Sequence, residues 1–124
     1  MSEPSKIRTG EKIRQGRDRF QAFLAPCESA EDVPGILRKL ERKTKGASHV
    51  SWALRPGNPG SVTEMKSDGG ESGSGNCILD VMRKRKARNV LVVVARWYGG
   101  RHLGSLRFRI YRKLTGRILK KGNR

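Results

Sequence analysis

The chain contains one uninterrupted run of apolar, mostly β-branched residues, from Val90 to Ala95. Residues of this kind favour strands, and a strand without alternating polar positions is typical of the middle of a sheet. We therefore expect a central strand here, covered on both sides or nearly so.

Three further strands and three helices are predicted from the spacing of apolar residues. Together with the central run, the strands lie at residues 19–25, 48–54, 62–66 and 90–95. The helices lie at residues 29–46, 78–86 and 105–120, with Ser29 and Ser105 as capping residues. This order of elements predicts a single α+β domain over residues 17–121.

The two ends of the chain are expected to lie outside this domain. Residues 1–16 are polar and are interrupted by Pro4, Gly10 and Gly16, so they predict a flexible basic arm that orders only against a partner. Residues 122–124 are expected to form a short tail.

Charge is the most informative global property. The formal net charge is +17, but residues 1–82 hold thirteen basic residues against eleven acids, a net of only +2. Residues 83–124 hold fifteen basic residues and no acid. So much like charge is costly unless a polyanion neutralises it, which favours RNA or an RNA-rich particle as partner.

The basic residues of this last third are the predicted phosphate contacts. They are Arg83, Lys84, Arg85, Lys86, Arg88, Arg96, Arg101, Arg107, Arg109, Arg112 and Lys113. Without an identifiable base-reading motif, they predict recognition of RNA by shape or backbone. In the alternative interpretation, these residues only solvate the protein or serve as a localisation signal.

A glycine-rich segment after the central strand is a second candidate site, made of Trp97, Tyr98, Gly99, Gly100 and Gly104. The aromatic residues could stack on bases, although residues that end a central strand more often cap the core, and we expect at most one to be exposed. The glycines could admit a phosphate at a helix start or simply permit a tight connection. They lack the lysine of a nucleotide-binding loop, so no ATP or GTP site is expected.

Catalysis is not expected. Asp68 and Glu71 lack a partner base, and Ser72 and Ser74 are predicted to lie in a flexible turn. The two histidines have no metal-like spacing to other ligands. We therefore expect no metal, cofactor or small-molecule substrate. Cys27 and Cys77 are expected to be free thiols. No apolar run is long enough to span a bilayer and no targeting segment is evident, so we expect no membrane association and an intracellular, cytoplasmic location, with nucleolus and mitochondrion left open.

Several motifs occur in the order found in one known family. They are Arg19-Phe20, His49, Trp52-Ala53, the Asp-Gly-Gly-Glu turn at residues 68–71, the segment 89–100, Leu103-Gly104 and Arg107-Phe108. Over about residues 17–119 the chain resembles the IMPACT family, which includes the bacterial YigZ proteins (UPF0029), and it is most similar to the eukaryotic branch. It departs from the family pattern at Gly69, Lys84, Arg85, Arg101 and His102, and each change makes the charge more positive.

This resemblance implies an α+β fold like domain 2 of ribosomal protein S5, with a four-stranded, mostly antiparallel sheet and helices packed on one face. It also implies a link to translation control. Eukaryotic relatives restrain the starvation-responsive kinase of initiation factor two, a role assigned chiefly to an RWD domain that we expect this chain to lack. We therefore expect a non-catalytic protein that docks on ribosomal or other structured RNA; the alternative is a protein–protein regulator of that kinase pathway.

Overall fold

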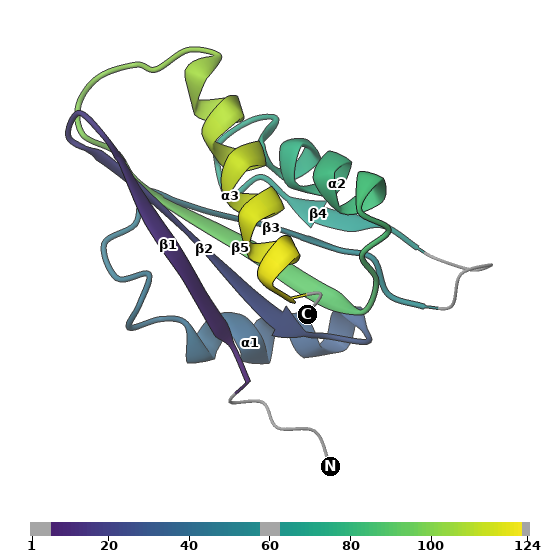
Figure 1. Ribbon diagram of the computed structural model, residues 1–124. Coiled ribbons are helices and arrows are strands. Elements are labelled where there is room, and N and C mark those ends of the chain that lie inside the picture. Colours follow the sequence, from purple (N-terminus) through teal and green to yellow (C-terminus); the bar gives the residue numbers. More distant parts are fainter. Residues whose placement is uncertain (1–5, 58–62, 123–124) are drawn as a thin grey trace.

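The computed structural model describes residues 6–57 and 63–122, which form one sheet with helices on both sides (Figure 1). The strands are β1 (Arg8–Gln15), β2 (Asp18–Pro26), β3 (His49–Leu54), β4 (Met65–Ser67) and β5 (Val90–Trp97). The helices are α1 (Val33–Lys39), α2 (Ser74–Lys84) and α3 (Leu106–Gly122). The α+β class predicted from the sequence is confirmed. No helix in the described ranges is both long and apolar enough to cross a membrane.

The apolar run forms the centre of the sheet, as predicted. Strand order is β1-β2-β5-β3-β4, and β5 pairs antiparallel with β2 on one side and with β3 on the other. Every pairing in the sheet is antiparallel.

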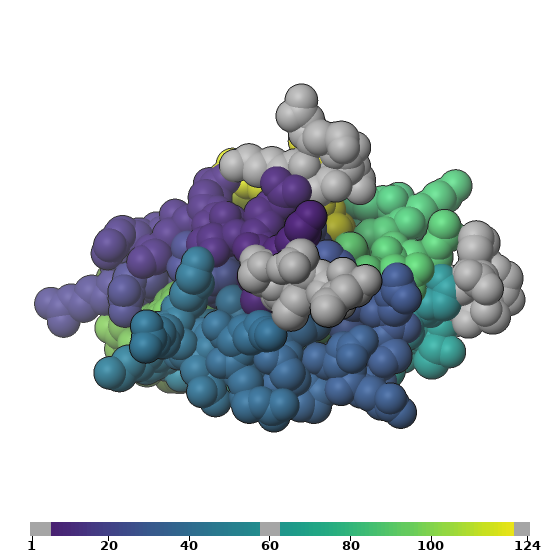
Figure 2. Space-filling view, turned by 90° about the horizontal axis from the view of Figure 1, so that it is seen from below, coloured from purple at the N-terminus to yellow at the C-terminus, as the bar shows by residue number. Residues whose placement is uncertain are grey.

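The two faces of β5 are covered by different helices. Val92 and Val94 belong to a core cluster that contains residues of α2 and α3, whereas Leu91 and Val93 belong to a second cluster that contains residues of α1. Figure 1 shows α1 below the sheet and the other two helices above it, and Figure 2 shows the molecule from the α1 side. The one-face arrangement implied by the resemblance is therefore wrong. The reason is the continuous apolar run itself, because both of its faces need cover.

The predicted strand count of four and the flexible N-terminal arm are also corrected. Residues 8–15 form β1, which pairs antiparallel with β2 at the edge of the sheet, so the folded unit begins before residue 17. The strand escaped prediction because Ile13 alone among its residues packs against the core, and the rest is polar. Residues 1–5 of the predicted arm lie outside the described residues, as do residues 123 and 124 of the tail, whereas Gly122 ends α3.

Three other boundaries differ from expectation. Helix α2 spans Ser74–Lys84 rather than residues 78–86, so Ser74 lies in a helix and not in the predicted flexible turn. The first helix spans Val33–Lys39 after a single 3-10 turn, and turns occupy residues 40–46, where a helix was expected to continue. Pro34 does lie in the opening turn of α1, as predicted. The strand expected at 62–66 is β4 at 65–67, and Val62 lies outside the described residues.

Candidate functional site

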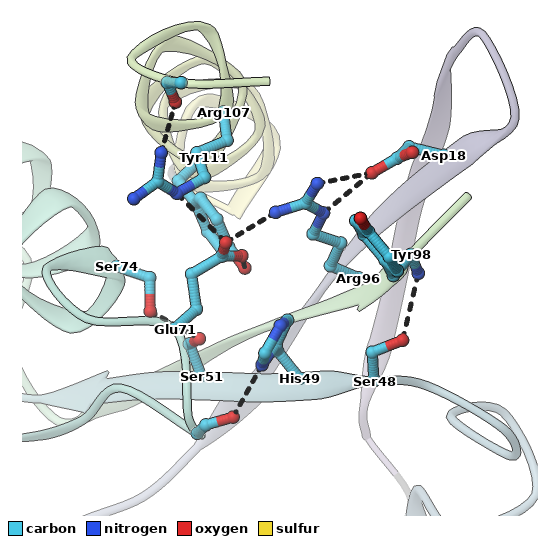
Figure 3. Close-up of polar contacts among 12 residues, drawn as sticks. Asp18, Ser48, His49, Ser51, Glu71, Ser74, Arg96, Tyr98, Arg107 and Tyr111 are labelled. Carbon is cyan, nitrogen blue, oxygen red and sulfur yellow. Dashed lines mark hydrogen bonds and ion pairs between the residues drawn. The ribbon is translucent and has the colours of Figure 1, made fainter. Parts of the chain in front are cut away.

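A buried cluster of charged side chains lies at one end of the sheet, where β5 ends and β2 begins (Figure 3). The Arg96 guanidinium donates through Nε and Nη2 to Oδ2 of Asp18, at 2.8 and 2.5 Å, and through Nη1 to Oε2 of Glu71, at 2.5 Å. Arg96 is 3% exposed, Asp18 1% and Glu71 7%. Burial alone lowers the pKa of Arg96, but the hydrogen bonds and charges of the two carboxylates outweigh it, so the net pKa lies above its ordinary value.

Helix α3 supplies the other partners of Glu71. The Tyr111 hydroxyl donates to Oε1 at 2.5 Å, and the Arg107 Nε lies 3.0 Å from Oε2. Burial and the neighbouring carboxylate both raise the pKa of Tyr111, so its hydroxyl stays a donor. The cluster thus joins β2, β5, α3 and the loop before α2, and its two guanidinium charges balance its two carboxylates.

The loop that carries Glu71 is held by a second set of bonds. The Asp68 carboxylate accepts the backbone N–H of Gly73 at 3.2 Å and of Gly75 at 2.8 Å, at the start of α2. Burial raises the pKa of Asp68, but these two donors outweigh it and the net pKa is lowered. Gly69 has φ +56° and lies so close to β3 that a Cβ would stand 2.1 Å from the Val50 carbonyl oxygen. The Asp-Gly-Gly-Glu turn therefore fixes the position of Glu71.

An open cavity of about 560 Å³ lies beside the charged cluster. Its walls include His49 from β3, Tyr98 after β5, and His102, Leu103 and Arg107 around the start of α3. Tyr98 is 45% exposed, and its ring centroid lies 6.2 Å from that of His102.

The eleven predicted phosphate contacts divide into three groups. Arg96 is buried with both carboxylates on its guanidinium, so its position does not support contact with an external phosphate. Arg83, Arg107 and Arg112 lie within salt-bridge distance of Glu64, Glu71 or Asp80. The other seven are exposed and have no acidic partner within salt-bridge distance among residues 6–57 and 63–120; they are Lys84, Arg85, Lys86, Arg88, Arg101, Arg109 and Lys113.

Six of these seven lie on α2, on α3 or in the turn after α2, and we refer to them as the α2–α3 basic surface. Its residues are Lys84, Arg85, Lys86, Arg88, Arg109 and Lys113. The two helices lie side by side on the same face of the sheet (Figure 1). Arg85 Nη1 donates to the Gly116 carbonyl at 3.1 Å, which ties the end of α2 to α3. The remaining residue, Arg101, lies near the start of α3.

The aromatic pair at the end of β5 is divided as expected. Trp97 is buried, and its Nε1 donates to the Lys45 carbonyl at 2.8 Å, so it caps the core. Tyr98 is exposed and remains available for stacking. Gly99 makes the tight connection: its N–H donates to Asp18 Oδ1 at 2.8 Å, and a Cβ there would stand 2.4 Å from the backbone of Arg17.

The groups considered for catalysis have other roles in the structure. Ser74 is buried, with its Oγ 2.6 Å from that of Ser51, and Nδ1 of His49 lies 3.1 Å from the Gly69 carbonyl oxygen. Cys27 and Cys77 are free, as expected, and burial raises the pKa of both thiols. Within the described ranges, no three potential metal ligands gather in one place.

Sequence reasoning missed two members of the buried cluster. Asp18 is 78 residues from Arg96, and Tyr111 is 40 residues from Glu71, so neither pair follows from local spacing. For Glu71 and Arg96 the sequence did contain a signal, because each lies in a motif of the resemblance, at residues 68–71 and 89–100. In the structure these two motifs meet through the ion pair between Glu71 and Arg96.

Comparisons with known proteins identify the family to which the chain is similar. The sequence pattern of the family described as "Impact N-terminal domain" matches residues 16–119. A protein named as an IMPACT homolog from Caenorhabditis elegans is 41% identical over 94% of this chain, and Protein IMPACT-B from Xenopus tropicalis is 38% identical over 83% of it. The matches cover 48% and 34% of those two proteins, so the chain spans about half of their length or less.

Two solved structures share the fold. A crystal structure described as that of a hypothetical protein superposes with a TM-score of 0.82 at 24% identity, over 94% of this chain and 58% of the other. The structure of Yih1, described as a two-domain translational regulator, superposes with a TM-score of 0.65 at 29% identity, over 98% of this chain and 48% of Yih1. Since the family pattern covers nearly the whole folded unit, the chain belongs to the Impact N-terminal domain family.

Proposed function

We propose that this domain is a non-catalytic, translation-linked binding module that docks on ribosomal or other structured RNA through the α2–α3 basic surface. The observation that carries the proposal is the exposure of these six basic residues, on neighbouring elements of one face, without acidic partners among the described residues. The buried cluster balances its own charges, so the excess positive charge is left at the surface.

The translation link is supported by the relatives. Yih1 is described as a translational regulator, and the two chains share a fold over nearly all of this one. Because the match covers about half of Yih1, that regulatory role is a proposal for this chain rather than a transferred property. Such a role fits a cytoplasmic protein with both RNA and protein partners in the translation machinery.

Recognition would depend on phosphates rather than on base sequence. Lysine and arginine side chains at the end of α2, in the turn after it and on α3 suit the backbone of a folded RNA, whose bases are shielded in the deep major groove. Each phosphate that is neutralised releases counterions, so affinity should fall steeply with salt. If four to six of the basic residues make contact, log K should fall with a slope of roughly −3 to −5 against log salt.

The experiment is sedimentation of tagged protein from a gentle lysate across a salt series, with and without nuclease. The wild type should migrate with ribosomal particles and lose this association under nuclease or moderate salt. The triple variant Lys84→Glu/Arg109→Glu/Lys113→Glu should sediment as a light species, since its three changed residues lie on the proposed surface.

The matched control is Arg38→Glu/Lys39→Glu/Arg42→Glu, which makes the same change in net charge at exposed positions on the α1 side of the sheet. It should keep the association, because the change lies on the opposite face. Equal loss in both variants would show that only net charge matters and would argue against a defined RNA surface.

A second candidate function is regulation through a protein partner, as in the amino-acid-starvation kinase pathway. The similarity to Yih1 favours it. This candidate predicts light, nuclease-indifferent migration, or comigration with ribosomal particles that survives nuclease and shows modest salt sensitivity.

A further inference from the structure

The cavity beside Tyr98 has the features of a pocket for one unpaired nucleotide. We propose that it receives a single unstacked nucleotide of a bound RNA, with the base on the Tyr98 ring and the phosphate near Arg107. This inference rests on the proposed RNA docking and adds a second, chemically distinct contact to it. The volume of about 560 Å³ lies within the range of roughly 300–1,000 Å³ typical of small-molecule pockets.

The pocket presents hydrogen-bond donors rather than acceptors to a ligand, because the carboxylate of Glu71 is already bonded to protein donors. Glu71 accepts from Arg96 Nη1 and Tyr111, and Arg107 Nε lies 3.0 Å from it. Arg107 also donates through Nη1 to the Gly104 carbonyl, which leaves its Nη2 group with no protein acceptor among the described residues. A guanidinium held on two sides presents its last nitrogen in a fixed direction, as phosphate recognition requires.

The electrostatic balance of the cluster permits an anion to approach. Asp18 and Glu71 are each paired with Arg96, and Glu71 also pairs with Arg107, so the four charges cancel. Glu71 is the one acid among the cavity-lining residues, and the histidines His49 and His102 add further ring nitrogens to the wall. A phosphate therefore meets no uncompensated carboxylate there.

The exposed aromatic edge supplies a surface for a flat ring. Tyr98 and His102 lie with ring planes inclined by 49° and centroids 6.2 Å apart, which is too close for a base to lie between them. Tyr98 is the one large hydrophobic residue that is exposed in the described part of the chain. Its backbone N–H donates to Ser48 Oγ at 3.0 Å, and the Arg96 guanidinium lies 5.5 Å from its ring centroid. The ring is thus held in place while remaining accessible, which is the arrangement of a stacking platform.

The adjoining loop provides a place for the flanking strand. A second hollow, of about 390 Å³, is lined by Gly99, Gly100 and Arg101 of the same loop together with Gly16 and Arg17 of the β1–β2 turn. Arg17 and Arg101 are both exposed. The next phosphate of a single strand that leaves the Tyr98 pocket would meet this pair of arginines.

The test compares the affinity of the protein for a short single-stranded RNA and for a duplex of equal length at one salt concentration, by fluorescence anisotropy. The pocket takes only unpaired nucleotides, so the wild type should bind the single strand more tightly. Tyr98→Ala should weaken binding to the single strand by about 5- to 160-fold, the range that corresponds to a lost base–aromatic stack, and should leave duplex binding unchanged. Tyr98→Phe keeps the ring and should behave like the wild type.

Lys113→Ala is the control, because Lys113 lies on the α2–α3 basic surface and does not line the cavity. It should weaken binding to both RNAs alike. An unchanged ratio of affinities in Tyr98→Ala, with RNA binding otherwise intact, would overturn the nucleotide pocket and leave the RNA docking in place. Absence of binding to either RNA at low salt would overturn both proposals.

Discussion

Replacing Arg96 by methionine would remove the one side chain that joins both buried carboxylates. Methionine keeps an unbranched apolar stem of similar reach, so the change isolates the guanidinium. Asp18 would lose both of its bonds to the arginine, and Glu71 would keep only Tyr111 and Arg107. We expect a large loss of folding free energy from this single substitution.

The size of the loss follows from burial. Removing one partner of a buried ion pair costs about 3–5 kcal/mol, because the remaining charge is left unpaired and desolvated. For a domain of this length that loss corresponds to a fall in Tm of roughly 10–20 °C. It would consume a large part of a total stability of about 5–15 kcal/mol.

Arg83→Met is the matched control, since Arg83 also contacts two carboxylates, those of Glu64 and Asp80, but its side chain is 47% exposed. Exposed pairs contribute less than about 1 kcal/mol each. The assay is urea unfolding followed by tryptophan fluorescence, with thermal unfolding as a check. If Arg96→Met destabilised the protein no more than Arg83→Met, the buried cluster would contribute no more to folding stability than an exposed ion pair, and the reasoning from burial would be refuted.

Three further predictions concern the residues around the cluster. Gly69→Ala should lower the free energy of unfolding by roughly 3 kcal/mol or more, because its Cβ would stand 2.1 Å from the Val50 carbonyl oxygen. Gly100 has φ +97° but open space around it, so Gly100→Ala should lower that free energy by only about 1–2 kcal/mol; thermal unfolding measures both. Tyr111→Phe leaves Oε1 of the buried Glu71 carboxylate without its donor, so the free energy of unfolding measured by urea titration should fall by about 1.5–3 kcal/mol. The pKa of Asp68 is lower in the folded state, so its contribution to stability is full above the unfolded value near 3.8 and is lost as pH falls through the folded value. Asp68→Asn should therefore flatten the loss of stability below about pH 4, and an unchanged acid-unfolding curve would contradict this.

The central part of the fold could be predicted from sequence because it depends on local apolar patterns. The runs that became β2, β3 and β5 are apolar enough to identify strands, and the four-residue apolar spacing over residues 106–118 identifies α3. The same patterns do not identify β1, which gains its place by pairing with β2 rather than by burying side chains. Cover on both faces was predicted from the composition of the central run, whereas the one-face arrangement taken from the resemblance was wrong.

The candidate site was predictable only in part, because its members come from distant segments. The sequence placed Arg96 and Arg109 in the same class, as basic residues of an acid-free third. The structure separates them: the first is buried between two carboxylates, and the second is exposed on α3. The local sequence around Arg96 does not identify its partners, since these are acids that lie in β2 and in the loop before α2.

This separation decides how charge should be tested in this family member. A substitution at Arg96 changes the net charge by the same amount as one at Arg109. The Arg96 substitution acts by destabilising the fold, whereas the Arg109 substitution acts by changing the electrostatic field at the surface. Loss of RNA binding in an Arg96 variant would therefore say little about phosphate contact unless folding were measured in the same sample. The exposed residues Lys84, Arg109 and Lys113 avoid this ambiguity, because none of them has an acidic partner among the described residues and each can be reversed without leaving a buried carboxylate unpaired.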